Sequence, residues 1–385
     1  MIRSSELLLN FIINAAWQIT AIALVATALA RILNNAPARF RHLLWVGAFF
    51  LSVALPVWTL PVTKTEGSPR QTVNRIAAQA TALASPKDTS NKQDMAGRVS
   101  AGGPIIQSRA NLGRLFERRI QQFSTGPTAM VLLTLGYLLF ILYRFGRLWR
   151  FWQRTASLTR SGYQTEMSPS MIAVAERCCS AFRLKQVPIM CTTLSSTPGV
   201  VGGRQPMVVL PQSLFGELPA ETLYSILGHE MAHIARRDFQ WNVVYEILWL
   251  PISFHPLAGF LKKQIEKTRE LACDEMVTEK LLAPVVHARS LIRIAGVLIN
   301  PAAQALTLGI FDGNILEERI MKLTCKTRRL GARSGRLLTL SAVALLCLSC
   351  FAISMFSIEL RAAQAQLAAV TSTGNDGVVG AALQL

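Results

Sequence analysis

Charged residues are scarce in this sequence. Only 16% of its 385 residues are charged, whereas a soluble domain averages about 25%, and the mean hydropathy is +0.34. This shortage argues against a purely soluble protein. The apolar residues are gathered into blocks, because four long stretches contain no charge at all: 7–30, 43–62, 121–143 and 337–358.

Each uncharged block is long enough to cross a membrane as a helix, which takes about 20 apolar residues. We therefore predict membrane helices at about 7–30, 43–62, 128–149 and 336–358. Two alternatives stay open. Some blocks are buried core helices, or the first block, which ends in Ala28-Leu29-Ala30, is a cleaved signal peptide.

Acidic residues are also few, 22 against 40 Lys and Arg, which gives a net charge of +18. Much of the basic charge lies beside the apolar blocks, where cytoplasmic loops carry such an excess and anionic lipids attract it. We therefore expect a lipid bilayer as partner and no direct nucleic-acid binding. The 31–42 loop and residues 150–335 would lie in the cytoplasm, with the amino terminus, residues 63–127 and the tail 359–385 outside.

Cysteine is absent from residues 63–120, and the seven cysteines lie in the expected cytoplasmic segment or in the fourth block. This distribution is typical of a reducing compartment without disulfides. Residues 64–104 have no aromatic side chain, which indicates a flexible loop. Residues 105–123 place Leu and Phe at helical spacing between arginines, which predicts an amphipathic helix on the membrane surface; a solvated linker is the alternative.

Residues 150–335 are the only stretch long enough for a soluble domain. Residues 187–210 carry Val, Ile and Thr with Pro and Gly, which predicts short strands and a turn. Helix patterns follow over 219–237, 241–250 and 257–282. The predicted fold is therefore a multi-pass α-helical membrane protein with an α+β domain inserted between the third and fourth membrane helices.

Histidine is rare, with five in the chain, yet two of them fall in Gly228-His-Glu-Met-Ala-His233. On a helix, positions i and i+4 lie one turn apart on the same face, so His229 and His233 can bind one Zn²⁺. Glu230 would lie beside the metal and take the proton from its bound water, whose pKa is about 7. The motif predicts a zinc-dependent peptidase with one Zn²⁺ per chain.

A catalytic zinc needs a third protein ligand and an open fourth position. A third histidine six residues after His233 is absent, because Phe239 stands there. We prefer Glu270, since a helical return can bring it opposite the histidine pair, and Asp274 one turn later can accept the N–H of a ligating histidine. The alternative ligands are the remaining histidines: His42, His255 and His287. No residue is assignable as the oxyanion stabiliser, for which the candidates are Tyr245, His255 and His287.

Four motifs make the sequence resemble a known family: Thr197-Pro-Gly-Val-Val-Gly, Met207-Val-Val-Leu-Pro211, Leu227-Gly-His-Glu-Met-Ala-His-Ile-Ala-Arg-Arg-Asp238 and Arg269-Glu-Leu-Ala-Cys-Asp274. They are similar to those of the BlaR/MecR-type membrane metallopeptidases of bacteria. The resemblance implies a gluzincin domain facing the cytoplasm from the inner membrane. It implies His229, His233 and Glu270 as zinc ligands and Glu230 as the catalytic base.

The resemblance also implies a regulatory role, because relatives cleave a transcriptional repressor, themselves, or both, after sensing a signal. The β-lactam sensors of the family carry a penicillin-binding domain after the last membrane helix, and no Ser-x-x-Lys follows the fourth block here. Direct β-lactam acylation is therefore not expected. An edge strand near 200–210 would hold an extended peptide or protein substrate by backbone pairing.

Three functions are consistent with these features. The first is a regulatory protease that cleaves a helix-turn-helix repressor or itself. The second is a broad-specificity quality-control or processing protease of the membrane. The third is a non-catalytic transducer with a structural zinc site. The intact Glu230 argues against the third function, because a structural site needs no base at that position.

Overall fold

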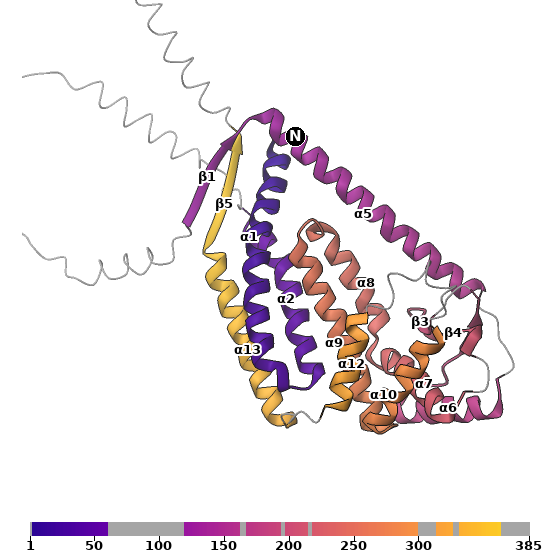
Figure 1. Ribbon diagram of the computed structural model, residues 1–385. Coiled ribbons are helices and arrows are strands. Elements are labelled where there is room, and N and C mark those ends of the chain that lie inside the picture. Colours follow the sequence, from indigo (N-terminus) through magenta and orange to yellow (C-terminus); the bar gives the residue numbers. More distant parts are fainter. Residues whose placement is uncertain are drawn as a thin grey trace, which may run out of the picture.

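The fold was obtained as a computed structural model. It describes residues 2–60, 119–161, 167–193, 197–214, 218–298, 313–325 and 331–362. The described part is mostly helical, with one two-stranded and one three-stranded sheet. Figure 1 shows a helical bundle at one end of the molecule and a mixed helix and sheet region at the other.

Within the described residues, four helices are long and apolar enough to cross a membrane. They are α1 (Ile2–Ile32), α2 (Ala38–Trp58), α5 (Pro127–Ser161) and α13 (Ala332–Ser354). Their positions correspond to the four uncharged blocks, with shifted ends. Helix α5 continues well beyond the expected end at 149, so the segment predicted as a soluble domain begins inside this helix.

The fourth block does not stay helical to residue 358. Helix α13 ends at Ser354, and strand β5 (Phe356–Ala362) follows it. The side-chain amide of Asn14 on α1 anchors this strand, because it donates to the Ile358 carbonyl at 2.9 Å and accepts from the Ile358 N–H at 3.1 Å. The expected tail 359–385 therefore begins within a strand.

Strand β5 pairs in parallel with β1 (Arg119–Thr125), with Arg119 opposite Phe356. The amphipathic helix predicted over 105–123 is therefore wrong over 119–123, and its earlier part lies outside the described residues, as does the loop predicted over 64–104. Helical periodicity could not reveal this strand, because its hydrogen-bonding partner lies more than 200 residues later in the chain.

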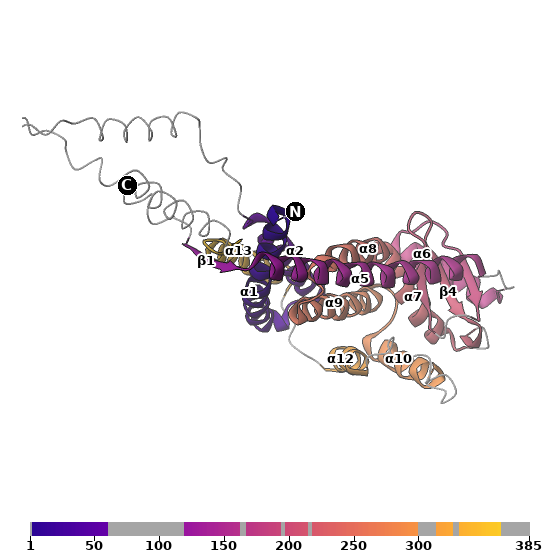
Figure 2. The same cartoon turned by 90° about the horizontal axis from the view of Figure 1, so that it is seen from above.

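Helices α1, α2 and α13 lie side by side, and α5 starts beside the N-terminal end of α1 and runs along the rest of the molecule (Figures 1 and 2). The Tyr137 hydroxyl on α5 donates to the Pro251 carbonyl at 2.6 Å, and Arg144 stacks over the Trp249 ring. Most of the large apolar side chains of α5 are exposed, including Leu132, Leu139 and Leu142. A lipid environment accounts for such a surface.

Helix α9 (Pro256–Lys280) packs antiparallel along α2. The Ala38 N–H donates to Glu275 at 2.9 Å, His42 lies 3.2 Å from Thr268, and Trp45 meets Phe260 edge to face. The α2 residues recur at spacings of four and three, which keeps one face of that helix on its neighbour. The bundle core therefore extends from the membrane-length helices into α9.

The other end of the molecule contains a sheet in the order β2–β4–β3, which packs against α6 and α7. The elements at this end of the molecule are α6 (Pro169–Phe182), β2 (Ile189–Thr192), β3 (Gly199–Val201), β4 (Met207–Pro211), α7 (Ala220–Arg236), α8 (Asp238–Trp249), α10 (Pro284–Leu298) and α12 (Gly313–Thr324). Across all the described residues, the single 3-10 turns are η1 (Leu33–Asn35), η2 (Gln212–Leu214) and η3 (Leu250–Ile252). The helix patterns expected from 219, 241 and 257 correspond to α7, α8 and α9.

Strand β4 is central, parallel to β2 and antiparallel to β3, so the predicted edge strand near 200–210 is right for β3 and wrong for β4.

Two local features position this end. Arg237 adopts a left-handed conformation with φ 58°, which ends α7 and starts α8 at once. Gly228 allows α7 to approach α9, because a Cβ there would lie 2.6 Å from Leu281 Cδ1.

The contact between α9 and the bundle can be tested by overpacking. Ala258 on α9 is completely buried, so Ala258→Leu should cost about 1–3 kcal/mol and lower the unfolding temperature in detergent by several degrees. The matched control is Gly259→Ala, because a Cβ at Gly259 meets nothing within 4 Å; it should leave the temperature unchanged or raise it. An Ala258→Leu protein as stable as its parent would contradict the described packing.

Candidate metal centre

Three side chains from α7 and α9 point their donor atoms at one another. The Nε2 atoms of His229 and His233, one turn apart on α7, lie 3.2 Å from each other. Glu270 on α9 places Oε2 at 3.1 Å from His229 Nε2 and Oε1 at 3.7 Å from His233 Nε2. These ligand atoms all lie within 4.8 Å of one another, close enough to hold a metal ion.

The opposite ring nitrogens of both histidines face buried carboxylates. His233 Nδ1 lies 2.7 Å from Asp238 Oδ2, and His229 Nδ1 lies 3.2 Å from Asp274 Oδ1. Histidines that bind metals usually donate this second N–H to a carboxylate, which fixes the tautomer and leaves Nε2 free as a ligand. Two nitrogens and one carboxylate are also a donor set that Zn²⁺ accepts, so the residues present fit the ion.

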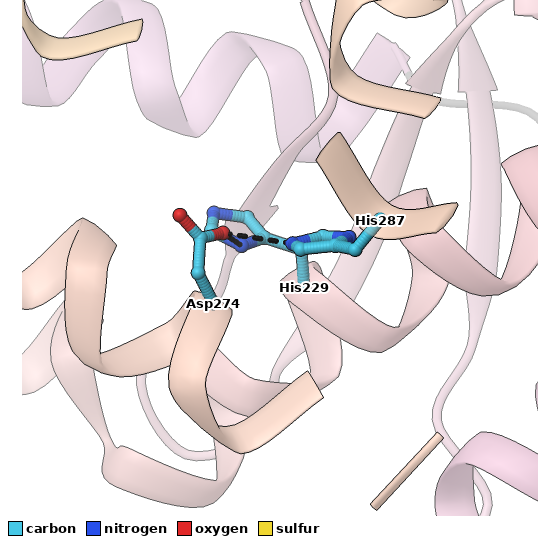
Figure 3. Close-up of side chains that lie close together, drawn as sticks. All are labelled: His229, Asp274 and His287. Carbon is cyan, nitrogen blue, oxygen red and sulfur yellow. Dashed lines mark hydrogen bonds and ion pairs between the residues drawn. The ribbon is translucent and has the colours of Figure 1, made fainter. Parts of the chain in front are cut away.

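Asp274 connects the centre to a second buried layer. Figure 3 shows His229 and His287 beside this one carboxylate. His287 Nε2 lies 3.0 Å from Asp274 Oδ1, while His287 Nδ1 lies 2.8 Å from the Ser225 hydroxyl. Arg319 donates through Nε to Oδ2 and through Nη2 to Oδ1, each at 2.8 Å.

The charge state of Asp274 follows from these partners. Burial raises the pKa of its carboxyl, but Arg319 and the hydrogen bonds from His229 and His287 outweigh burial and hold that pKa well below its usual range. Asp274 is therefore an anion with donors on both oxygens. An anionic acceptor of this kind can keep His229 in the orientation that ligation needs.

Glu230 follows His229 on α7 and lines a cleft of about 840 Å³. Among the side chains that the structure describes, none forms a hydrogen bond or ion pair with the Glu230 carboxylate. The cleft is also lined by strand β3 and by apolar side chains: Leu291, Ile294, Ile315 and Leu316. The metal centre thus opens onto a groove large enough for a peptide segment.

The remaining histidines do not reach this centre. The ring of His255 caps α9 and lies 3.3 Å from Thr20 on α1, and His42 contacts Thr268. His287 approaches through Asp274 and not through the converging nitrogens. None of the three oxyanion candidates lines the cleft, because Tyr245 is buried among aromatic rings of α2 and α8, and His255 and His287 are held elsewhere.

Three contributors were not recognised from the sequence. Asp238 stands five residues after His233, and the left-handed turn at Arg237 directs it back to that ring; the Arg-Arg-Asp ending of the motif contained it. Cys273 lies beside the same pair, with Sγ 3.3 Å from His233 Nδ1. Arg319 arrives from α12, and no spacing or motif in the sequence connects it to the histidine pair.

Comparison with known proteins identifies the family of this chain. The profile of the family described as BlaR1 peptidase M56 matches residues 8–323. The chain therefore belongs to this family of membrane-associated metallopeptidases. It is also 24% identical over 123 residues to the regulatory protein BlaR1 of Bacillus licheniformis, an alignment that covers 32% of this chain and 20% of that relative.

The role of Asp238 can be tested by metal affinity. Asp238→Asn keeps the shape of the side chain but removes the charge that faces His233, so Zn²⁺ affinity should fall about 10–100-fold. Competition with a chromogenic chelator measures this change in the purified protein. The control is Glu246→Gln on the same helix, because Glu246 lines the cleft but pairs with Lys262. Equal affinities for both variants would exclude a role for Asp238 in the centre.

Proposed function

We propose that this chain is a membrane-bound zinc metalloendopeptidase of the gluzincin type. His229, His233 and Glu270 would hold one Zn²⁺, and Glu230 would be the catalytic base. The observation that supports this most strongly is the convergence of three ligand atoms beside a carboxylate that has no partner among the described side chains, at the wall of a cleft. A purely structural zinc site would have no use for that carboxylate.

Each residue of the centre has a role in peptide hydrolysis. A Zn²⁺ held there supplies a Lewis acid that polarises a carbonyl and lowers the pKa of a water to about 7. Glu230 takes a proton from the attacking water and later passes it to the leaving amine. Asp238 and Asp274 keep both imidazoles oriented with Nε2 toward the centre, so no reorientation is required during the reaction.

The substrate would be an extended peptide segment in the cleft. Residues of β3 line that cleft, and within the described sheet β3 pairs only with β4. Its second edge can therefore add a substrate strand through backbone hydrogen bonds. The apolar wall formed by α10 and α12 would receive the side chains of that strand.

The proposed role is regulatory, with a helix-turn-helix repressor or the chain itself as substrate. Membership of the M56 family and the likeness to a relative named a regulatory protein support this role. The same family, with the exposed apolar surface of α5, supports a location in the bacterial inner membrane. The basic residues beside the apolar blocks favour a cytoplasmic position for the metal centre.

Loss of the base should separate metal binding from catalysis. Glu230→Gln has nearly the same shape but cannot take the proton, so proteolysis should fall by about 10²–10⁴-fold while bound zinc is retained. Casein cleavage and self-cleavage would be followed beside zinc content in detergent. Glu221→Gln, at the exposed start of the same helix, should behave like the parent. Absence of zinc from the active parent protein would refute the proposed chemistry.

The orientation can be tested with a native cysteine. Cys325 is exposed directly after α12, on the side of the metal centre. A maleimide that does not cross membranes should label it in inverted vesicles and not in intact spheroplasts. Cys325→Ser should abolish that labelling. Labelling of Cys325 in intact spheroplasts would place the metal centre on the outer side of the membrane.

A further inference from the structure

A buried arginine lies against the metal centre and has no role in the chemistry described so far. Only 12% of the Arg319 side chain is exposed. Its Nε and Nη2 atoms donate hydrogen bonds to the two oxygens of Asp274, and Nη2 lies 3.4 Å from His229 Nε2. Its Nη1 atom is 3.8 Å from Glu270 Oε2. One guanidinium thus borders two of the three converging side chains.

Helix α12 holds this arginine in place by contacts on both sides. Glu318 forms an ion pair with Lys267 of α9. Leu316 and Leu323 pack against Ala288 and Leu291 of α10. Arg319 therefore reaches the centre from a helix that is docked on both α9 and α10. The docking of α12 therefore helps to fix the position of the Arg319 side chain.

A cation beside a metal site would repel Zn²⁺ if its charge were not balanced. Here the planar fork of Arg319 meets the carboxylate of Asp274 at two points, the geometry in which arginine forms its strongest pairs. The pair is neutral overall, so its main effect on the centre is directional. It holds Oδ1 where His229 Nδ1–H can donate to it.

We propose that Arg319 is a positioning residue of the metal centre. It fixes both oxygens of Asp274, Asp274 fixes the ring of His229, and the docking of α12 thereby sets the affinity of the centre for Zn²⁺. This rests on the proposed function, because it takes His229 as a zinc ligand. Without Arg319, no donor among the described residues holds Asp274 Oδ2, and the carboxylate is free to turn away from His229.

The test measures Zn²⁺ affinity by chelator competition in the full-length protein, with two substitutions. Arg319→Gln removes charge and fork, while Arg319→Lys keeps the charge and loses the fork. Both should bind Zn²⁺ about 10–100-fold more weakly than the parent, as expected when a partner of a ligating histidine is lost. Lys267→Gln, which breaks the ion pair between α12 and α9 away from the centre, should bind within about threefold of the parent.

A double-mutant cycle shows whether Arg319 acts through Asp274. In an Asp274→Asn background, adding Arg319→Gln should not weaken Zn²⁺ binding further and should if anything strengthen it, because the carboxylate that Arg319 positions is already absent and an unbalanced cation is removed. This comparison also decides the matter if Arg319→Gln alone fails to fold, since the double variant contains neither buried charge. A merely structural role of Arg319 would lower the affinity equally in both backgrounds.

The outcomes distinguish this proposal from the function on which it rests. Parent protein that binds no zinc would overturn the proposed function and this proposal with it. Zinc-binding parent protein, with Arg319→Lys and Arg319→Gln of equal affinity to it, would overturn this proposal alone. Weaker binding in both variants, absent from the Asp274→Asn background, would establish Arg319 as the positioning residue.

Discussion

The packing of α9 along α2 is the contact on which the arrangement of this molecule depends. One face of α9 lies on a membrane-length helix through Leu261, Ile265 and Ala272, while Glu270 and Asp274 project from another face toward α7. Because a helix is rigid over this length, the position of α2 determines where these two carboxylates lie. The metal centre is therefore connected to the helical bundle through a shared helix, α9, and not through a linker.

The second constraint is that the two carboxylates behind the histidines have hydrogen-bond partners. Asp238 and Asp274 each accept from an imidazole, and Asp274 also accepts from His287 and Arg319. A buried network of this kind rigidifies its surroundings when it is fully satisfied and is costly when one member is lost. The centre consequently combines parts of α7, α8, α9, α10 and α12, although only two of these helices supply converging ligand atoms.

Local patterns in the sequence predicted much of this molecule. Uncharged blocks indicated four membrane-length helices, and the His-Glu-x-x-His spacing on a predicted helix placed two imidazoles on one face. The failures have a common cause. Residues 119–123 form a strand because β5 is available to pair with them, and Tyr245 and His255 leave the cleft because α1 and α2 pack against their helices. Each of these placements depends on a contact with residues far away in the chain, which the periodicity of one segment does not reveal.

Sequence spacing alone accounts for the apolar helices, the separation of His229 and His233, and the presence of Glu270 and Asp274 one turn apart, because helical geometry converts sequence spacing directly into positions in space. The residues that face them depend on how the helices pack. The tertiary structure turned Asp238 back onto His233, placed His287 behind Asp274 and brought Arg319 to the centre from α12. The reason is physical: contacts between separate helices depend on how whole faces pack, and that information is distributed over the entire chain.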